Sequence, residues 1–296
     1  MWRAGGHWLP ISCGVYLTRC WFFIISITVG AKLAGHRVTH AYDRNPIFLK
    51  SYRANHPEVE THCIDVLDLR ASDLPDADIL MGSTPCESFS RANIHSRACD
   101  MTLTNHFLKL VAEYNPKYWV MENVPEVAKF LNGSGTPCRI LCTADFGVPQ
   151  RRKRLMAGNY PEPVMTHRFE DLRSHIPFGN IKDTNKDNWS ILSKKAIEGV
   201  YRRVHEMGLK GHGFKVHFVD DKTVLHTITA SESHGVRTGS QIIYDGGVLR
   251  RLTYIECIRA QSFPDDYIFC GTLAERYKQI GQAVPPLLMK AILTGI

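Results

Sequence analysis

The sequence predicts an α/β fold with a doubly wound, mostly parallel sheet and a second, smaller irregular domain. Two observations predict it. Apolar, strand-like runs alternate with helix-like segments between about residues 29 and 160, as expected for a parallel sheet covered by helices. This alternation stops after Pro161 and Pro163, where the next eighty or so residues become irregular and charged. The predicted domains are residues 1–163 together with 264–296, and residues 164–263.

The composition sets the broad class of the protein. The chain has 296 residues, of which 44% are hydrophobic, so it can bury a large core. Lys and Arg outnumber Asp and Glu by 36 to 29, which gives a formal net charge of +7 and suits a polyanionic partner. Nine cysteines form an odd set without the close spacing of a disulfide scaffold, which favours reduced thiols in a cytoplasmic protein.

An apolar run near the N-terminus, residues 21–29, allows two interpretations. It follows Arg19 as a signal peptide would, and it is too short to span a bilayer as a helix. We favour a buried first strand, because the chemistry indicated below belongs in a reducing compartment. The predicted protein is therefore cytoplasmic and has no membrane partner.

The remaining elements follow in order along the chain. Helix periodicity is clearest after residue 102, where Leu103, Phe107, Leu110 and Val111 share one face. Gly35 suits the C-terminus of a first short helix. The predicted elements are helix 29–34, strand 37–42 closed by Asp43, helix 46–56, strand 61–66, strand 78–82, helix 103–114, strand 118–121, strands 140–146 and 154–160, a strand-like run 214–218, an amphipathic helix 249–261, and a last helix opened by residues 284–289.

Four chemically active side chains fall where predicted parallel strands end: Asp43, Asp65, Cys86 and Glu122. Ligands of doubly wound sheets bind at these carboxyl ends. Cys86 follows Pro85 in a polar turn, so it is a candidate nucleophile, although a free cysteine more often serves as a small core residue. A carboxylic acid on the neighbouring strand end supplies a general acid in the same crevice.

A cluster of cations follows, in the segment Gln150-Arg151-Arg152-Lys153-Arg154. Such a cluster usually forms a solvated face. Here it adjoins a strand that returns to the same crevice, so contact with phosphate is a serious alternative.

These segments resemble signature blocks of the cytosine-C5 DNA methyltransferases, in the order in which that family has them. The resemblance covers the chain from about residue 29 to its end, and five blocks in order make it specific. The matching blocks are Pro85-Cys86 with Phe89-Ser90, Glu122-Asn123-Val124, residues 150–154, the helix block with Arg251-Leu252-Thr253, Glu256, Arg259, Gln261 and Phe263-Pro264-Asp265, and Gly281-Gln282-Ala283-Val284-Pro285-Pro286.

The resemblance implies a mechanism of methylation. The Cys86 thiolate, preceded by Pro85, would attack C6 of a cytosine, while Glu122 donates to N3. Arg154 would bond the base O2, and Arg152 would brace phosphate and loop. The cytosine must leave the duplex to reach the thiol, so base flipping is implied. The implied partners are double-stranded DNA and a possible cognate restriction endonuclease, and we expect a monomer.

The resemblance also implies S-adenosylmethionine as the cofactor. Asp43 matches the acid that binds the ribose hydroxyls, Asp65 the one at the adenine amino group, and Val66 packs on the ring. Without the resemblance, either aspartate would first be read as a strand-end cap. Further candidate cofactor-binding residues are Arg44, Gln282 and Val284.

The sequence departs from the family pattern at its start. The family has a Gly-rich turn that admits the cofactor, whereas residues 20–26 here contain no Gly-x-Gly. Residues 19–23, read one nucleotide later, can encode Gly-Ala-Gly-Phe, so a frameshifted start within residues 1–28 is one explanation. Glu87 replaces the glutamine common after the nucleophile, and its charge would raise the thiol pKa.

Three rival functions and one open assignment, the role of the cations in the irregular region, remain. The rivals are a tRNA methyltransferase of the same chemistry, a catalytically dead nucleic-acid-binding homologue, and a cysteine hydrolase, which lacks a recognisable histidine motif. We predict no metal site, because Cys138 and Cys142 have no second ligand pair at zinc-like spacing. Recognition residues are expected within 164–245, where five cations either meet phosphate or form a solvated helix face: Lys194, Lys195, Arg202, Arg203 and Lys210.

Overall fold

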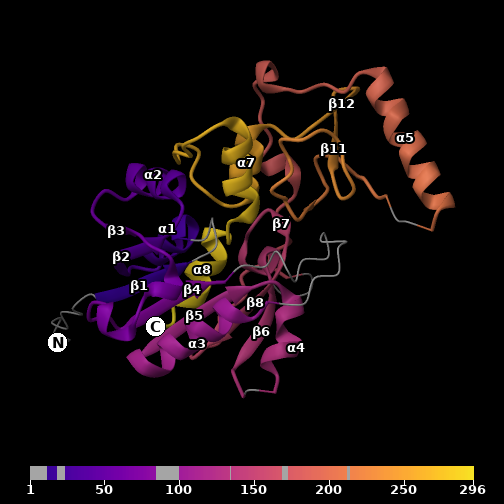
Figure 1. The fold of residues 1–296 in the computed structure, drawn as a ribbon. Helices are drawn as coiled ribbons and strands as arrows, with labels where there is room; N and C mark the ends of the chain where they lie inside the picture. The colour runs from indigo at the N-terminus through magenta and orange to yellow at the C-terminus, as the bar shows by residue number, and fades with distance from the viewer. Residues whose placement is uncertain (1–11, 19–23, 85–99, 134, 169–172, 212–213) are drawn as a thin grey trace, which may run out of the picture.

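The computed structural model describes residues 12–18, 24–84, 100–133, 135–168, 173–211 and 214–296. Its centre is a seven-stranded sheet of order β3-β2-β1-β4-β5-β8-β6 (Figure 1). The neighbouring strands from β3 to β5 pair in parallel, and β8 runs antiparallel to both β5 and β6. The predicted α/β class with a mostly parallel sheet is therefore confirmed. The strands are β1 (Ser12–Thr18), β2 (Arg37–Asp43), β3 (Glu60–Cys63), β4 (Ile79–Ser83), β5 (Tyr118–Asn123), β6 (Cys138–Cys142) and β8 (Lys153–Gly158).

Helices cover both faces of this sheet because its central strands are apolar on both sides. In β4, Ile79 and Met81 belong to one buried cluster, while Leu80 between them belongs to the other. The first cluster includes residues of α1, α2 and α8, and the second includes residues of α3 and α4. The helices of these two layers are α1 (Ile24–Leu33), α2 (Pro46–Asn55), α3 (Thr102–Tyr114), α4 (Ala128–Leu131) and α8 (Pro286–Leu293).

The first described helix corrects the prediction for the apolar run 21–29. We expected a buried strand there, but α1 begins at Ile24, and the strand β1 lies earlier, at Ser12–Thr18. Every residue from 25 to 31 is buried, so this part of the helix is enclosed on all sides. A helix of this kind shows no amphipathic period and cannot be told from a buried strand by pattern alone. Gly35 follows α1 at φ +90°, as expected of a residue that ends a helix.

Two predicted strands are shorter than expected because each gives way to a 3-10 turn. The strand predicted at 61–66 ends at Cys63, and the Asp65 side chain then accepts from the Leu67 amide to start a turn. The strand predicted at 140–146 ends at Cys142 for the same kind of reason. The 3-10 turns are η1 (Val66–Asp68), η2 (Ala71–Asp73), η3 (Pro125–Val127), η4 (Thr143–Phe146), η5 (Phe178–Asn180) and η6 (Lys186–Asn188).

The region between residues 173 and 250 forms a smaller, irregular body beside the large sheet (Figure 1). It contains a three-stranded sheet of order β12-β11-β9 and one long helix, α5. A two-stranded ladder of β7 and β10 connects it to the basic segment that precedes β8. The proposed division into domains at residues 163 and 264 remains a prediction. The elements of this region and of the ladder are α5 (Lys194–Leu209), β7 (Gln150–Arg151), β9 (His217–Val219), β10 (Leu225–His226), β11 (Gln241–Asp245) and β12 (Val248–Arg250).

The amphipathic helix predicted at 249–261 is shorter than expected. Leu249 and Arg250 belong to strand β12, and helix α6 spans Tyr254–Ala260. The Thr253 side chain accepts from the Glu256 amide, and the Glu256 carboxylate accepts from the Thr253 amide at 2.8 Å. This capping box sets the start of the helix. Helix α7 (Leu273–Gln282) follows, and no helix among the described residues is long and apolar enough to cross a bilayer.

Candidate active site

Glu122 lies at the carboxyl end of β5 and is 1% exposed. Strand register places Ser83, the last residue of β4, directly beside it. The Ser83 hydroxyl donates to Glu122 Oε2 at 2.7 Å, and the guanidinium Nε of Arg154 from β8 lies 2.9 Å from Glu122 Oε1. Three neighbouring strands thus supply the carboxylate, the hydroxyl and the cation of one buried cluster.

The surroundings of Glu122 act on its proton in opposite directions. Burial raises the pKa of the Glu122 carboxyl above its ordinary value, whereas Arg154, Ser83 and Arg152 lower it. Burial dominates, so the pKa is raised overall. A carboxyl with a raised pKa keeps a larger protonated fraction near neutral pH and can act as a general acid.

The turn after β5 is bonded to the end of β4. The side-chain Nδ2 of Asn123 donates to the Thr84 hydroxyl oxygen at 2.7 Å, and the side-chain Oδ1 of Asn123 accepts from the Val124 backbone amide at 2.7 Å. Thr84 also shares a hydrogen bond with Thr104 of α3 at 3.0 Å. All these bonds are internal, so the chain leaving β4 is held beside Glu122.

The next three residues of that turn, to which roles were assigned from the sequence, are not described by the structure. Pro85, Cys86 and Glu87 lie outside the described residues. Their assignments therefore stay predictions, and the described part of the turn ends at Thr84.

Arg152 is 2% exposed, so its guanidinium faces the interior. It donates to the carbonyl of Ile228 at 2.8 Å and to the carbonyl of Gly281 at 2.9 Å. A Cβ added at Gly281 would lie 2.2 Å from the carbonyl carbon of Thr229, so only glycine permits this approach of helix α7 to the loop after β10. Arg152 is placed to hold the loop after β10 against the end of α7.

Gln150 is a second buried connector in the same segment. Its amide nitrogen donates to the Ala260 carbonyl and to the Gln261 side-chain oxygen, each at 2.8 Å, and its oxygen accepts from the Ile228 amide at 2.9 Å. Gln261 in turn donates to the Ile280 carbonyl at 2.5 Å. The basic segment is thereby bonded to both the irregular region and the C-terminal helices.

The candidate cofactor residues Asp43 and Asp65 follow adjacent strands of the sheet. Asp43 ends β2, is 1% exposed, and accepts from the Asn45 amide at 2.7 Å. Asp65 follows β3, and its Oδ2 lies 3.7 Å from a guanidinium nitrogen of Arg44. The structure therefore brings Arg44 and Asp65 together beside the end of the strand that carries Asp43.

The other candidate cofactor residues lie in three places. Val66 is 3% exposed and packs in the cluster on the α3 side of the sheet. Val284 is fully buried in the cluster on the α1 and α8 side. Gln282 ends α7, and its side-chain oxygen is buried and forms no hydrogen bond with any described residue.

The hydrogen bonds made by four residues of the site were not predicted from the sequence: Ser83, Thr84, Asn123 and Gln150. A signal was present, because all four are polar and stand within or beside apolar strands. Buried polar side chains need partners, so polar residues in such positions indicate a bonded network.

The five cations predicted for recognition are all exposed, and four of them lie on α5. Beside this helix is a cavity of about 580 Å³ whose lining includes Arg202, Arg203 and Arg251 against one acid, Glu206. The exposure fits both open interpretations, phosphate contact and a solvated helix face. The five cations are Lys194, Lys195, Arg202, Arg203 and Lys210.

Comparison with known proteins finds one family over nearly the whole chain. The sequence model of the family described as C-5 cytosine-specific DNA methylase matches residues 24–296. The chain is 28% identical over 316 residues to the type II methyltransferase M1.HphI of Haemophilus parahaemolyticus, covering 91% of this chain and 83% of that protein. It is 27% identical over 344 residues to the type II methyltransferase M.XorII of Xanthomonas oryzae, covering 90% and 80%.

Solved structures share the fold. The Dnmt2 methyltransferase of S. pombe has a TM-score of 0.67 at 18% identity, covering 94% of this chain and 97% of that one. A DNMT2 mutant of Spodoptera frugiperda has a TM-score of 0.66 at 15% identity, covering 93% and 97%. At these identities the likeness shows the fold alone.

Proposed function

Because the chain belongs to the family of C-5 cytosine-specific DNA methylases, we propose that it transfers a methyl group from S-adenosylmethionine to C5 of a cytosine in DNA. The observation that carries the proposal is the buried cluster of Glu122, Arg154 and Ser83 at the carboxyl ends of the central strands. A buried, hydrogen-bonded carboxyl with a raised pKa suits donation to a ring nitrogen.

Cys86 is the proposed nucleophile. It follows Thr84 by two residues, and a two-residue step spans at most about 7 Å between Cα atoms. Thr84 is itself bonded to Asn123, the neighbour of Glu122. This connection supports a shared crevice for the thiol and the carboxyl.

The proposed chemistry begins with a cytosine that has left the duplex. The Cys86 thiolate forms a bond to C6 while Glu122 gives a proton to N3, and C5 gains enamine character. Arg154 bonds the base O2 and keeps the Glu122 carboxyl oriented. After C5 carries the methyl group, its proton leaves to a base, the C6–sulfur bond breaks to return the thiolate, and the N3 proton returns to Glu122.

The residues near the ends of β2 and β3 fit the proposed cofactor in their chemistry. Asp43 and Asp65 offer carboxylates to ribose hydroxyls and an adenine amino group, and the buried oxygen of Gln282 has no partner among the described residues. Arg44, Val66 and Val284 complete the proposed set. When bound, S-adenosylmethionine supplies an electrophilic methyl group.

The experiment that tests the proposal is capture of the covalent adduct. A DNA duplex that contains 5-fluorocytosine, incubated with cofactor, is expected to give a protein–DNA species that survives denaturing electrophoresis. Cys86→Ser is expected to abolish the adduct and methylation while leaving DNA binding largely intact. The matched control is Cys63→Ser, a change of an exposed thiol at the end of β3 that should leave both unchanged.

The rival functions give different results in the same assays. Methylation of tRNA but not of duplex DNA would assign the substrate to RNA. A catalytically dead homologue would bind DNA but give no heat with S-adenosylmethionine in isothermal titration. A wild-type protein that binds cofactor and methylates DNA without forming the adduct would contradict the role of Cys86.

A further inference from the structure

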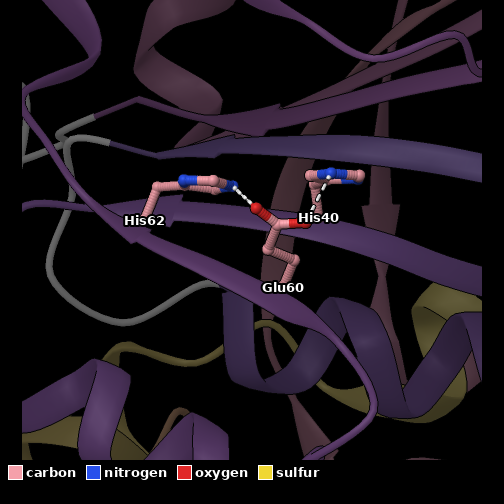
Figure 2. Close-up of side chains that lie close together, drawn as sticks. All are labelled: His40, Glu60 and His62. Atoms are coloured by element: carbon pink, nitrogen blue, oxygen red, sulfur yellow. Dashed lines mark ion pairs between the residues drawn. The ribbon is translucent and has the colours of Figure 1, made fainter.

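Three side chains with metal-ligating atoms meet on β2 and β3, away from the Glu122 cluster (Figure 2). His40 Nε2 lies 3.2 Å from Glu60 Oε2, and His62 Nε2 lies 3.4 Å from Glu60 Oε1. One ligand atom from each of the three residues lies within 4.8 Å of the other two. In Figure 2 the two imidazoles flank the carboxylate of Glu60.

The sheet geometry explains why these residues converge. His40 of β2 is the register partner of Glu60 of β3, and Tyr42 is the partner of His62. Residues two apart on a strand share a face, so Glu60 and His62 project to the same side as His40. β3 is an edge strand, so the cluster is open to solvent on one flank, and Glu60 is 65% exposed.

Packing fixes the orientation of the imidazoles. The rings of His40 and His62 are parallel, with an interplanar angle of 4° and centroids 5.7 Å apart. The ring of Tyr42 stacks on that of His62 at 4.5 Å. His62 Nε2 is buried and forms no hydrogen bond with any described residue. Stacking therefore holds this nitrogen 3.4 Å from Glu60 Oε1, where a metal ion placed between them can bind both side chains.

The separations suit a small divalent ion. Zinc binds imidazole nitrogen and carboxylate oxygen at about 2.0–2.2 Å in a tetrahedron, so its neighbouring ligand atoms stand about 3.3–3.6 Å apart. The observed distances are 3.2 Å from His40 Nε2 to Glu60 Oε2 and 3.4 Å from His62 Nε2 to Glu60 Oε1, and one ligand atom of each residue lies within 4.8 Å of the other two, so small side-chain shifts bring the three ligands to this spacing. Two imidazoles and one carboxylate form a ligand set that zinc uses with a water molecule in the fourth position.

We propose that His40, Glu60 and His62 form a binding site for one divalent transition-metal ion, Zn²⁺ in the first instance. The ion bridges β2 and β3, and these strands lead to Asp43 and Asp65. Because a ligand that binds only the folded protein stabilises it, zinc raises the melting temperature. The site is independent of the proposed methyl transfer and stands whether or not that function is correct.

Metal titration of the full-length protein tests the site. Isothermal titration with ZnCl₂ is expected to show one site per chain that His40→Ala, Glu60→Gln and His62→Ala each remove or weaken by at least about 100-fold. Loss of a supporting partner alone typically weakens metal binding by 10–100-fold, and a ligand contributes more. Circular dichroism melts without metal show that each variant folds.

Two controls separate this site from other zinc ligands of the chain. Cys63 is the residue after His62, and its sulfur donates to the Arg44 carbonyl at 3.7 Å on the opposite face of β3. The control variants are Cys63→Ser and His205→Ala, and His205 lies on the exposed helix α5. Each is expected to change zinc affinity by no more than about two-fold. Loss of even a supporting partner would cost about 10–100-fold. Titration with Co²⁺ adds a readout, because nitrogen and oxygen ligands lack the thiolate charge-transfer absorption.

The outcomes are decisive in either direction. Zinc binding that depends on all three residues, with a raised melting temperature, supports the site. If the wild type gives no zinc heat, the three side chains form only ion pairs and the proposal is wrong. If Cys63→Ser abolishes binding, or if the three variants keep it, the metal lies elsewhere and the proposal is equally wrong.

Discussion

The ends of the central strands and helix α5 both carry arginines, yet they are built in opposite ways. Arg154 faces a carboxylate that is 1% exposed, and Arg152 is itself 2% exposed. On α5, Arg202 and Arg203 are exposed, and Arg202 Nε lies 4.0 Å from Glu206 Oε1 on the helix surface.

This difference indicates whether catalysis and DNA binding each depend on single residues. Buried charges interact strongly because water does not screen them, so loss of one partner is costly. Exposed charges are screened by salt and contribute little one by one. We expect the rate of the proposed chemistry to depend on one or two side chains. We expect the affinity for DNA to be distributed over several exposed cations.

The largest effect is expected at the buried carboxyl. Glu122→Gln keeps the shape of the side chain but removes its proton, and loss of a general acid typically costs 10²–10⁴-fold in rate. We expect single-turnover methylation to slow by at least about 100-fold. Glu113→Gln, which alters an exposed acid of α3, serves as the matched control and should change little.

The pH dependence sharpens this prediction. Burial raises the pKa of Glu122, and the protonated form is the donor, so the rate should fall as pH rises through that raised pKa. The thiolate of Cys86 is lost as pH falls, which gives the opposite limb. Glu122→Gln should remove the alkaline limb and leave the acidic one. An unchanged alkaline limb in the variant would exclude Glu122 as its source.

A smaller effect is expected at the buried guanidinium that bonds the loop after β10 and the end of α7. Arg152→Met leaves the carbonyls of Ile228 and Gly281 without their donor. Hydrogen bonds to charged groups contribute about 1.5–3 kcal/mol each, and partial hydration of the carbonyls offsets part of this, so we expect a loss of about 2 kcal/mol of stability. Chemical denaturation measures it. Arg151→Met, at the exposed neighbour, should cost less than 0.5 kcal/mol, as surface changes usually do.

The sequence predicted the parts of the site that depend on topology. Strands that alternate with helices run parallel, and parallel strands end at one edge, so Asp43 and Glu122 were placed correctly at strand ends. The side-chain directions were not predictable. The two buried bonds of Arg152, to a carbonyl of the loop after β10 and to a carbonyl of α7, depend on how residues 76 and 129 positions away fold back.

Other features of the fold were not predicted because the hydrophobic pattern of the sequence does not determine them. Helix α1, buried from residue 25 to residue 31, has the same apolar character as a buried strand. The cluster of His40, Glu60 and His62 depends on the register of β2 against β3, which the hydrophobic pattern of a four-residue edge strand specifies weakly. The alternation Glu-x-His was visible in the sequence, but its partner on another strand was not.

The smallest effect is expected on α5, and it separates the two interpretations of its cations. If Arg202 and Arg203 contact phosphate, replacing both by Ala should weaken DNA binding uniformly across sequences. The slope of log affinity against log salt should then fall by about 0.9 per lost contact, or about 1.8 in all. Lys109→Ala on α3 is the control, since this exposed lysine pairs with Glu113 far from α5 in the chain. An unchanged slope in the double variant would make this face of α5 a solvated helix surface, and the contacts with DNA would then have to come from other cations.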